Sequence, residues 1–119
     1  MKIKQLLMLT TLIASPYLWA HTALENSVPH NGAILNEAPK NIVLRFTQPT
    51  KLVKFELLSP KNQAIETAFK PTLQGHQEYV IKFDKPLTSG LHTVFWTLIG
   101  SDGHKVEGDL QFTVESLSD

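Results

Sequence analysis

The sequence of 119 residues contains no cysteine, and both of its methionines, Met1 and Met8, lie close to the N-terminus. Disulfides therefore cannot stabilise the fold, which must depend on a hydrophobic core and on strand pairing. Beyond Met8 the chain has no sulfur atom, so thiolate and thioether ligands are excluded from any metal site there. After residue 20, no apolar run approaches the roughly 20 residues of a membrane-spanning helix.

The N-terminal residues 1–20 have the layout of a secretory signal peptide. "MKIKQ" carries Lys2 and Lys4 without an acid, "LLMLTTLIA" is a short apolar core, and "SPYLWA" ends in a small residue. We predict cleavage after Ala20, which divides the chain into a signal peptide, residues 1–20, and a mature domain, residues 21–119. The alternative is an uncleaved anchor helix, which the short apolar core disfavours. The mature domain is then expected in the periplasm or outside the cell.

The predicted mature chain has 99 residues, enough for one small domain with one core. Loss of Lys2 and Lys4 leaves nine basic against eleven acidic residues, a net charge near −2. This weakly acidic balance argues against nucleic acid or an anionic membrane surface as a partner.

Period-two alternation of apolar residues predicts strands over residues 41–47, 51–59, 78–83, 91–99 and 109–115, and a weaker strand over 64–69. Residues 25–41, rich in Asn, Pro and Gly, are expected to form an irregular lead-in. We find no helical pattern and no repeat. Short strands separated by Pro and Gly turns predict an all-β fold, an antiparallel sandwich or small barrel. The residues expected on its inner face are Ile42, Leu44, Phe46, Val53, Phe55, Leu57, Val94, Trp96, Leu98, Leu110, Phe112 and Val114.

The segment "GSDGHKVEG", residues 100–108, joins the last two strong strands and contains a carboxylate and an imidazole two residues apart, Asp102 and His104. In an extended segment such residues project to the same side, where they can serve as two metal ligands. Asp-Gly is also among the commonest hairpin signals, and a His beside it can simply be exposed. The two interpretations are compatible, because a hairpin tip can present ligands.

His21 follows the predicted cleavage point and would become the first mature residue. Its free α-amine and its δ nitrogen could then bind one ion together, which no internal His can do. Together with Asp102 and His104 they would form a set of three nitrogens and one oxygen, the tetragonal arrangement that Cu(II) prefers. The α-amine has a pKa of about 7.7 to 8.0, so a metal can displace its proton near neutral pH. Whether His21 lies beside His104 is not established by the sequence.

The chain resembles the CopC family of periplasmic copper-binding proteins, also called PcoC or copper resistance protein C. The resemblance runs from His21 to about Val114 and includes "SVPHNGAIL", "IVLRFTQPT" and "SGLHTVFWTLIGSDGHKVEGDLQFTV". It implies an immunoglobulin-like, cupredoxin-like Greek-key β-sandwich or barrel that binds one Cu(II) per chain through His21, Asp102 and His104. It also implies a CopD-like inner-membrane protein as partner. The methionine-rich Cu(I) loop of some members is missing, and Ala23 stands where some members have a ligating His.

Three functions remain open: a Cu(II) carrier without enzymatic activity, a histidine-brace copper monooxygenase, and a metal-free immunoglobulin-like interaction domain. We favour the carrier, expected to be monomeric and not to bind polysaccharide, since the chain is short and Asp102 adds an anionic ligand. His30 and His76 are expected in polar loops away from metal. His92 shares a face with Val94 and Trp96, so it is expected to be a strand-end or partly buried residue rather than a metal ligand, and Trp96 is expected in the core.

Overall fold

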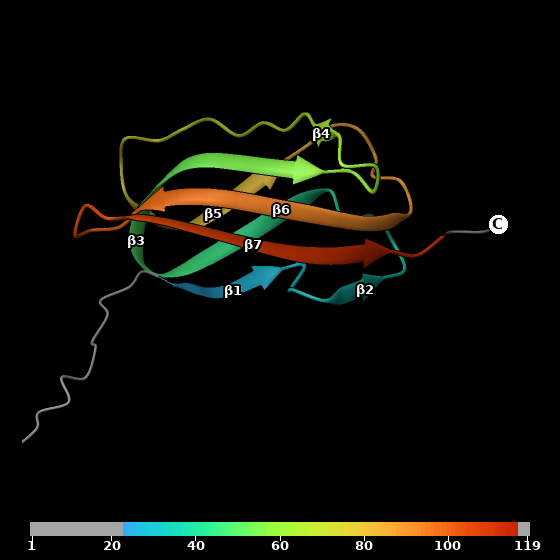
Figure 1. Ribbon diagram of the computed structural model, residues 1–119, viewed down its shortest axis with the longest axis horizontal. Helices are drawn as coiled ribbons and strands as arrows, with labels where there is room; N and C mark the ends of the chain where they lie inside the picture. The colour runs from blue at the N-terminus through green and yellow to red at the C-terminus, as the bar shows by residue number, and fades with distance from the viewer. Residues whose placement is uncertain (1–22, 117–119) are drawn as a thin grey trace, which may run out of the picture.

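A computed structural model of the chain describes residues 23–116. The predicted signal peptide and His21 lie outside the described residues. The described part is built from strands without a helix, which confirms the predicted all-β class (Figure 1). Residues 23–116 contain no helix long and apolar enough to cross a bilayer. The strands are β1 (Leu24–Val28), β2 (Ala33–Leu35), β3 (Asn41–Leu58), β4 (Ala64–Ile65), β5 (His76–Lys82), β6 (Gly90–Ile99) and β7 (Lys105–Val114).

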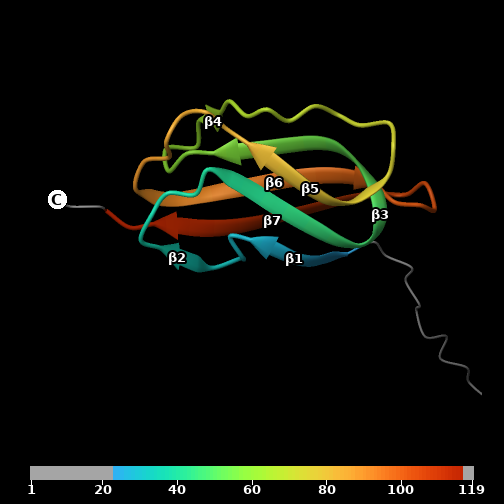
Figure 2. The same cartoon turned by 180° about the vertical axis from the view of Figure 1, so that it is seen from behind.

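The long strand β3 connects the two layers of the fold. Its first half pairs with β1 and β5, and its second half pairs with β4 and β6. Strand β6 continues to β7, and β7 pairs with β2. Figures 1 and 2 show how β3 curls from one layer into the other at one end of the molecule, beside the β6–β7 hairpin. The result is a strongly curled, barrel-like sheet.

Two predicted strands, residues 41–47 and 51–59, are in fact the two halves of β3. Pro49 lies between them, and because proline has no backbone N–H it cannot donate a hydrogen bond within the sheet. The register of the β3–β5 pairing shifts between Arg45 and Thr50 on either side of it. The proline between the two predicted strands therefore marks the bend at which β3 changes layers.

The core was predicted correctly at every position but one. Leu52 is buried and Val53 is exposed, whereas Val53 was expected on the inner face. The register of the β3–β6 pairing shifts between Leu52 and Lys54, so Val53 and Lys54 both face outward. Such a bulge changes which residues face inward, and strict alternation cannot predict it. The buried hydrophobic residues include Ile42, Leu44, Phe46, Phe55, Leu57, Val94, Trp96, Leu98, Leu110, Phe112 and Val114.

The lead-in, residues 25–41, was predicted to be irregular but contributes two strands. In β1 the inward position is occupied by Ser27, which is buried and donates a hydrogen bond from Oγ to the Pro29 carbonyl at 2.8 Å. With a polar residue in that position, the apolar alternation is lost. Strand β2 has three residues and runs parallel to β7, a pairing the sequence did not predict. The weaker strand predicted over 64–69 is reduced to the two residues of β4.

Candidate metal centre

The hairpin between β6 and β7 presents the candidate ligands. The last pair of the ladder is Ile99 and Lys105, and residues 100–104 form the tip. The Gly100 N–H donates to the His104 carbonyl at 2.9 Å, and the Gly103 N–H donates to the Gly100 carbonyl at 2.9 Å. Gly103 has a φ of +85°, a left-handed conformation that favours glycine. The Asp-Gly pair therefore forms the predicted turn, and this turn fixes the positions of Asp102 and His104.

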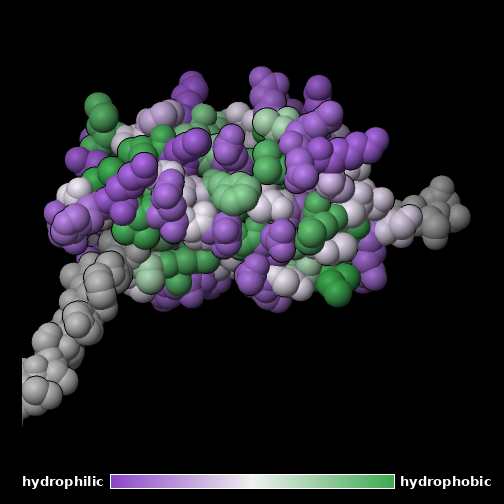
Figure 3. Space-filling model, viewed as in Figure 1, coloured by the Kyte–Doolittle hydropathy of each residue, from purple (hydrophilic) through white to green (hydrophobic). Residues whose placement is uncertain are grey.

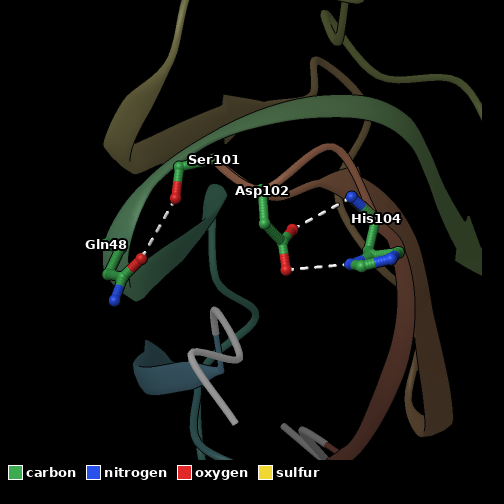
Figure 4. Close-up of polar contacts among 4 residues, drawn as sticks. All are labelled: Gln48, Ser101, Asp102 and His104. Atoms are coloured by element: carbon green, nitrogen blue, oxygen red, sulfur yellow. Dashed lines mark hydrogen bonds and ion pairs between the residues drawn. The ribbon is translucent and has the colours of Figure 1, made fainter.

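Asp102 and His104 contact each other directly at this tip (Figure 4). One carboxylate oxygen, Oδ1, accepts a hydrogen bond from the His104 backbone N–H at 3.0 Å. The other, Oδ2, lies 2.9 Å from the ring atom Nδ1. These contacts lower the pKa of Asp102, chiefly because the His104 ring donates to the carboxylate. The same contact raises the pKa of His104 above 6.5.

The two side chains are accessible to a metal ion. The side chain of His104 is 82% exposed and that of Asp102 is 43% exposed. Because Nδ1 faces the carboxylate, Nε2 is the ring nitrogen left to bind a metal, and among the described residues it makes no hydrogen bond. Imidazole nitrogen and carboxylate oxygen suit Cu(II) as donors. Within residues 23–116, however, no three His, Cys, Asp or Glu side chains gather closely enough to hold an ion.

Hydrogen bonds connect the first described residue, Ala23, to the bend of β3, and connect that bend to the hairpin tip. Ala23 exchanges hydrogen bonds with Thr47, its N–H donating to Oγ1 at 3.1 Å and its carbonyl accepting from the Thr47 N–H at 2.9 Å. The next residue, Gln48, accepts a hydrogen bond through Oε1 from the Ser101 hydroxyl at 3.3 Å. Figure 4 shows Ser101 and Gln48 on one side of Asp102, with His104 on the other. The start of β1 and the hairpin are thus at the same end of the molecule (Figures 1 and 2).

Thr47, Gln48 and Ser101 were not singled out from the sequence. Gln48 and Ser101 are 53 positions apart, and hydroxyl and amide side chains at such a separation give no local signal of their contact. The only available indication was Pro49, which marks the bend of β3 that carries Thr47 and Gln48 to the hairpin. The bend therefore supplies two side chains that hydrogen-bond to Ala23 and Ser101, and neither is a strong metal ligand.

Of the remaining histidines, His30 lies as expected, His92 is more deeply buried than expected, and His76 is in a strand rather than a loop. His92 is fully buried, and its ring stacks on Phe112 with centroids 5.3 Å apart. Burial lowers the pKa of His92, and its Nε2 has no hydrogen-bond partner within the described residues. His30 is in an exposed loop. His76 was expected in a loop but is the first residue of β5, exposed and packed edge-on against Tyr79.

Comparison with known proteins shows one consistent relationship. The model of the CopC domain family matches residues 24–115. Protein YobA of Escherichia coli K12 is 32% identical over 113 residues, covering 92% of this chain and 91% of that protein. Copper resistance protein C of Xanthomonas campestris pv. juglandis is 29% identical over 120 residues, covering 91% of each.

Two solved structures have the same fold. CopC from Methylosinus trichosporium OB3b superposes with a TM-score of 0.67 at 23% identity, over 83% of this chain and 98% of that one. The methionine-rich copper resistance protein PcoC from Escherichia coli superposes with a TM-score of 0.64 at 27% identity, over 81% of this chain and all of that one. The present chain differs from a methionine-rich protein in having no methionine after Met8.

Proposed function

The chain belongs to the CopC family, and from this membership and the geometry of the hairpin we propose that it binds one Cu(II) ion through His21, Asp102 and His104. In this proposal residues 1–20 are a signal peptide that is removed on export to the periplasm. Copper is then the cargo of a carrier without enzymatic activity. A CopD-like inner-membrane protein is the proposed recipient, and the carrier is proposed to be monomeric.

The Asp102–His104 contact is the observation that carries the proposal. The hairpin turn holds an imidazole and a carboxylate side by side on an exposed tip. The Asp102 carboxylate accepts a hydrogen bond from Nδ1 and so orients the ring. A carboxylate in this position also raises the basicity of the imidazole, as it does behind metal-bound histidines generally. To bind the same ion as Nε2, the Asp102 carboxylate must turn away from Nδ1, which is on the opposite side of the ring. The described part of the chain thus supplies two donor side chains, and a tight site needs at least one more.

The position of Ala23 supports His21 as the source of the remaining donors. Ala23 is fixed to Thr47, and the adjacent Gln48 reaches Ser101 in the hairpin. Two further residues extend a chain by at most about 7 Å, and a His side chain adds to that reach. Ala23, from which the chain continues toward His21, is therefore at the same end of the molecule as the tip. As the first residue of the mature protein it would offer its α-amine and its δ nitrogen to the same ion.

The donor set favours Cu(II) over other divalent ions and over Cu(I). Three nitrogens and one oxygen suit a tetragonal ion, and Cu(II) is at the top of the divalent affinity order. Cu(I) prefers thiolate and thioether ligands, which the chain lacks after Met8. We therefore expect Cu(I) to bind more weakly than in a relative with a methionine-rich loop.

A Cu(II) titration of the processed protein tests this function. Mass spectrometry must first show that His21 is the first residue. Trp96 is then the only tryptophan, and its emission should be quenched up to one equivalent of Cu(II). His104→Gln should lose the tight site, while His30→Gln, a matched change of an exposed histidine, should keep it. Unchanged emission at saturating Cu(II), two tight sites, or a preference for Zn(II) would each contradict the proposed site.

A further inference from the structure

The outer face of the sheet formed by β3, β6 and β7 carries a partly exposed aromatic side chain, Phe95. Phe95 is 40% exposed, whereas its neighbour Trp96 is buried on the inner face. Around Phe95 lies a groove of about 420 Å³. Figure 3 views this face and shows an apolar area near its middle with polar side chains around it. An exposed aromatic ring in a groove is a common feature of interaction sites.

The strand register places a carboxylate on each side of that ring. Phe95 is paired with Glu56 of β3 and with Asp109 of β7. Directly paired side chains on one face have Cβ atoms about 4.5 to 5.5 Å apart, so both carboxylates border the ring. Since adjacent strands are about 4.8 Å apart, the two carboxylate-bearing strands are separated by roughly 10 Å, wide enough for one side chain to enter between them.

The charges of the groove are not balanced internally. The next row, beyond Phe95 toward the hairpin tip, contains Lys54, Thr97 and Glu107. The groove thus has three carboxylates and one ammonium group. Glu107 lies 4.0 Å from Lys105, but within residues 23–116 neither Glu56 nor Asp109 has a cationic group within that distance. The groove therefore offers negative charge on both sides of an aromatic ring.

We propose that this groove binds an arginine side chain, flanked by an apolar residue, from a partner protein. A guanidinium group can stack on the face of an aromatic ring while its N–H groups donate to carboxylates at its edges. Glu56 and Asp109 are placed to accept these hydrogen bonds, with Phe95 as the surface on which the group stacks. An anionic partner such as a phospholipid headgroup would be repelled by the same carboxylates.

A second copy of this chain does not suit the groove as well. The chain has a single arginine, Arg45, on the outer face of the other layer. Its guanidinium group lies 3.9 Å from Glu25 and 3.6 Å from Glu78, so it is already engaged. We therefore propose a different protein, not a second copy of this chain, as the partner.

The groove lies on the same hairpin as the candidate metal centre. Glu107 is three residues from His104, a distance of about 10 Å along an extended strand. A protein held at the groove would be close enough to take up an ion bound at the tip. This role in copper transfer rests on the proposed function, whereas the binding of an arginine does not.

The test uses metal-free protein and a capped peptide of alternating leucine and arginine, with backbone amide chemical shifts as the readout. The matched peptide has citrulline, which is neutral and of the same shape, in place of arginine. We expect shifts around Glu56, Phe95 and Asp109 with the arginine peptide only. The double variant Glu56→Gln/Asp109→Asn should weaken binding by at least about tenfold, since the guanidinium group would lose both charge-assisted hydrogen bonds.

Two further variants serve as controls. Glu78→Gln removes a carboxylate from the outer face of the other layer and should leave peptide binding unchanged. Phe95→Thr keeps a residue suited to a strand and should abolish binding while Cu(II) affinity and thermal stability are retained. Equal binding of the citrulline peptide, or undiminished binding to the double variant, would overturn the proposal. So would protein-concentration-dependent shifts of the same residues without peptide, since these would indicate self-association. Because the peptide experiment contains no metal, its result is independent of the outcome of the Cu(II) titration.

Discussion

Gly108 lies opposite Trp96 in the β6–β7 ladder, and the indole ring occupies the space that a side chain at position 108 would need. A methyl group at Gly108 would lie 2.4 Å from Cζ2 and 2.5 Å from Cε2 of Trp96, well inside van der Waals contact. Trp96 also packs edge-on against Phe46, with ring centroids 6.3 Å apart. Glycine at 108 therefore permits a large buried ring in the hairpin that carries Asp102 and His104.

Gly108→Ala should accordingly destabilise the protein. The indole must move away from the new methyl group and disturb its packing on Phe46, and overpacking of this kind costs about 1 to 3 kcal/mol. Urea unfolding should show the loss, and the Trp96 emission of the folded variant should shift. Gly75→Ala is the matched control, because its methyl group would meet Pro49 and Thr50 at an ordinary 3.6 Å. Equal stability of the two variants would show that the ring is not confined by Gly108.

Sequence patterns predicted β6 and the second half of β7 well, because each has one face in the core and one in solvent, so apolar residues recur at every second position. Strand β7 begins at Lys105, four residues before the predicted start, since Gly108 interrupts the apolar alternation there. The same logic failed where the backbone departs from regular pairing, at the bulge between Leu52 and Lys54 and at Ser27, a polar residue in a buried position. The Asp102–His104 pair was predictable because both residues belong to one turn. The approach of Ala23 and Gln48 to that turn depends on the bend of β3, which local sequence does not describe.

Asp102 should affect both the affinity for Cu(II) and its dependence on pH. We expect affinity at pH 8 to fall from wild type to Asp102→Asn to Asp102→Ala, because the amide keeps an oxygen and the methyl group does not. Asp102 raises the pKa of His104, so as pH falls the proton displaces metal from His104 earlier than it would from an unpaired imidazole. In Asp102→Asn the pKa of His104 should return toward 6.5, as ring-proton NMR of the metal-free protein would show. An unchanged pKa would contradict the Asp102–His104 contact in solution.

His92 should make the folded protein sensitive to acid. Burial lowers its pKa in the folded state below 6.5, the value expected once the chain unfolds. The unfolded chain therefore gains a proton first as pH falls, and stability is lost from about pH 6.5 down to the folded pKa. His92→Phe keeps the stacking on Phe112 and removes this titration. Its stability should change less between pH 7.5 and 5.5 than that of the wild type, measured by urea unfolding. Equal losses in the two proteins would exclude His92 as a source of the acid sensitivity.

The role of His21 can be tested by adding a single residue. If the α-amine and the ring of His21 bind one ion together, a methionine placed before His21 converts the amine to an amide, which does not bind at neutral pH without losing its proton. His21, Asp102 and His104 all remain in this variant, and since Ala23 is fixed to Thr47 by two hydrogen bonds, the fold should be unaffected. We expect identical amide spectra for the two metal-free proteins. Their Cu(II) affinities should differ by at least about a hundredfold, or about 2.7 kcal/mol, in competition with a Cu(II) chelator.

A second pair of proteins separates loss of the chelate from a general effect of the extension. With His104→Gln in both members, the added methionine should still weaken Cu(II) binding, because the amine and ring of His21 would hold the ion in the shorter protein alone. An extension that acted only by crowding the hairpin would lose its effect once His104 is removed. Equal Cu(II) affinity of the extended and unextended wild-type proteins would make His21 an ordinary surface residue, and the third and fourth donors would then have to come from elsewhere in the chain or from solvent.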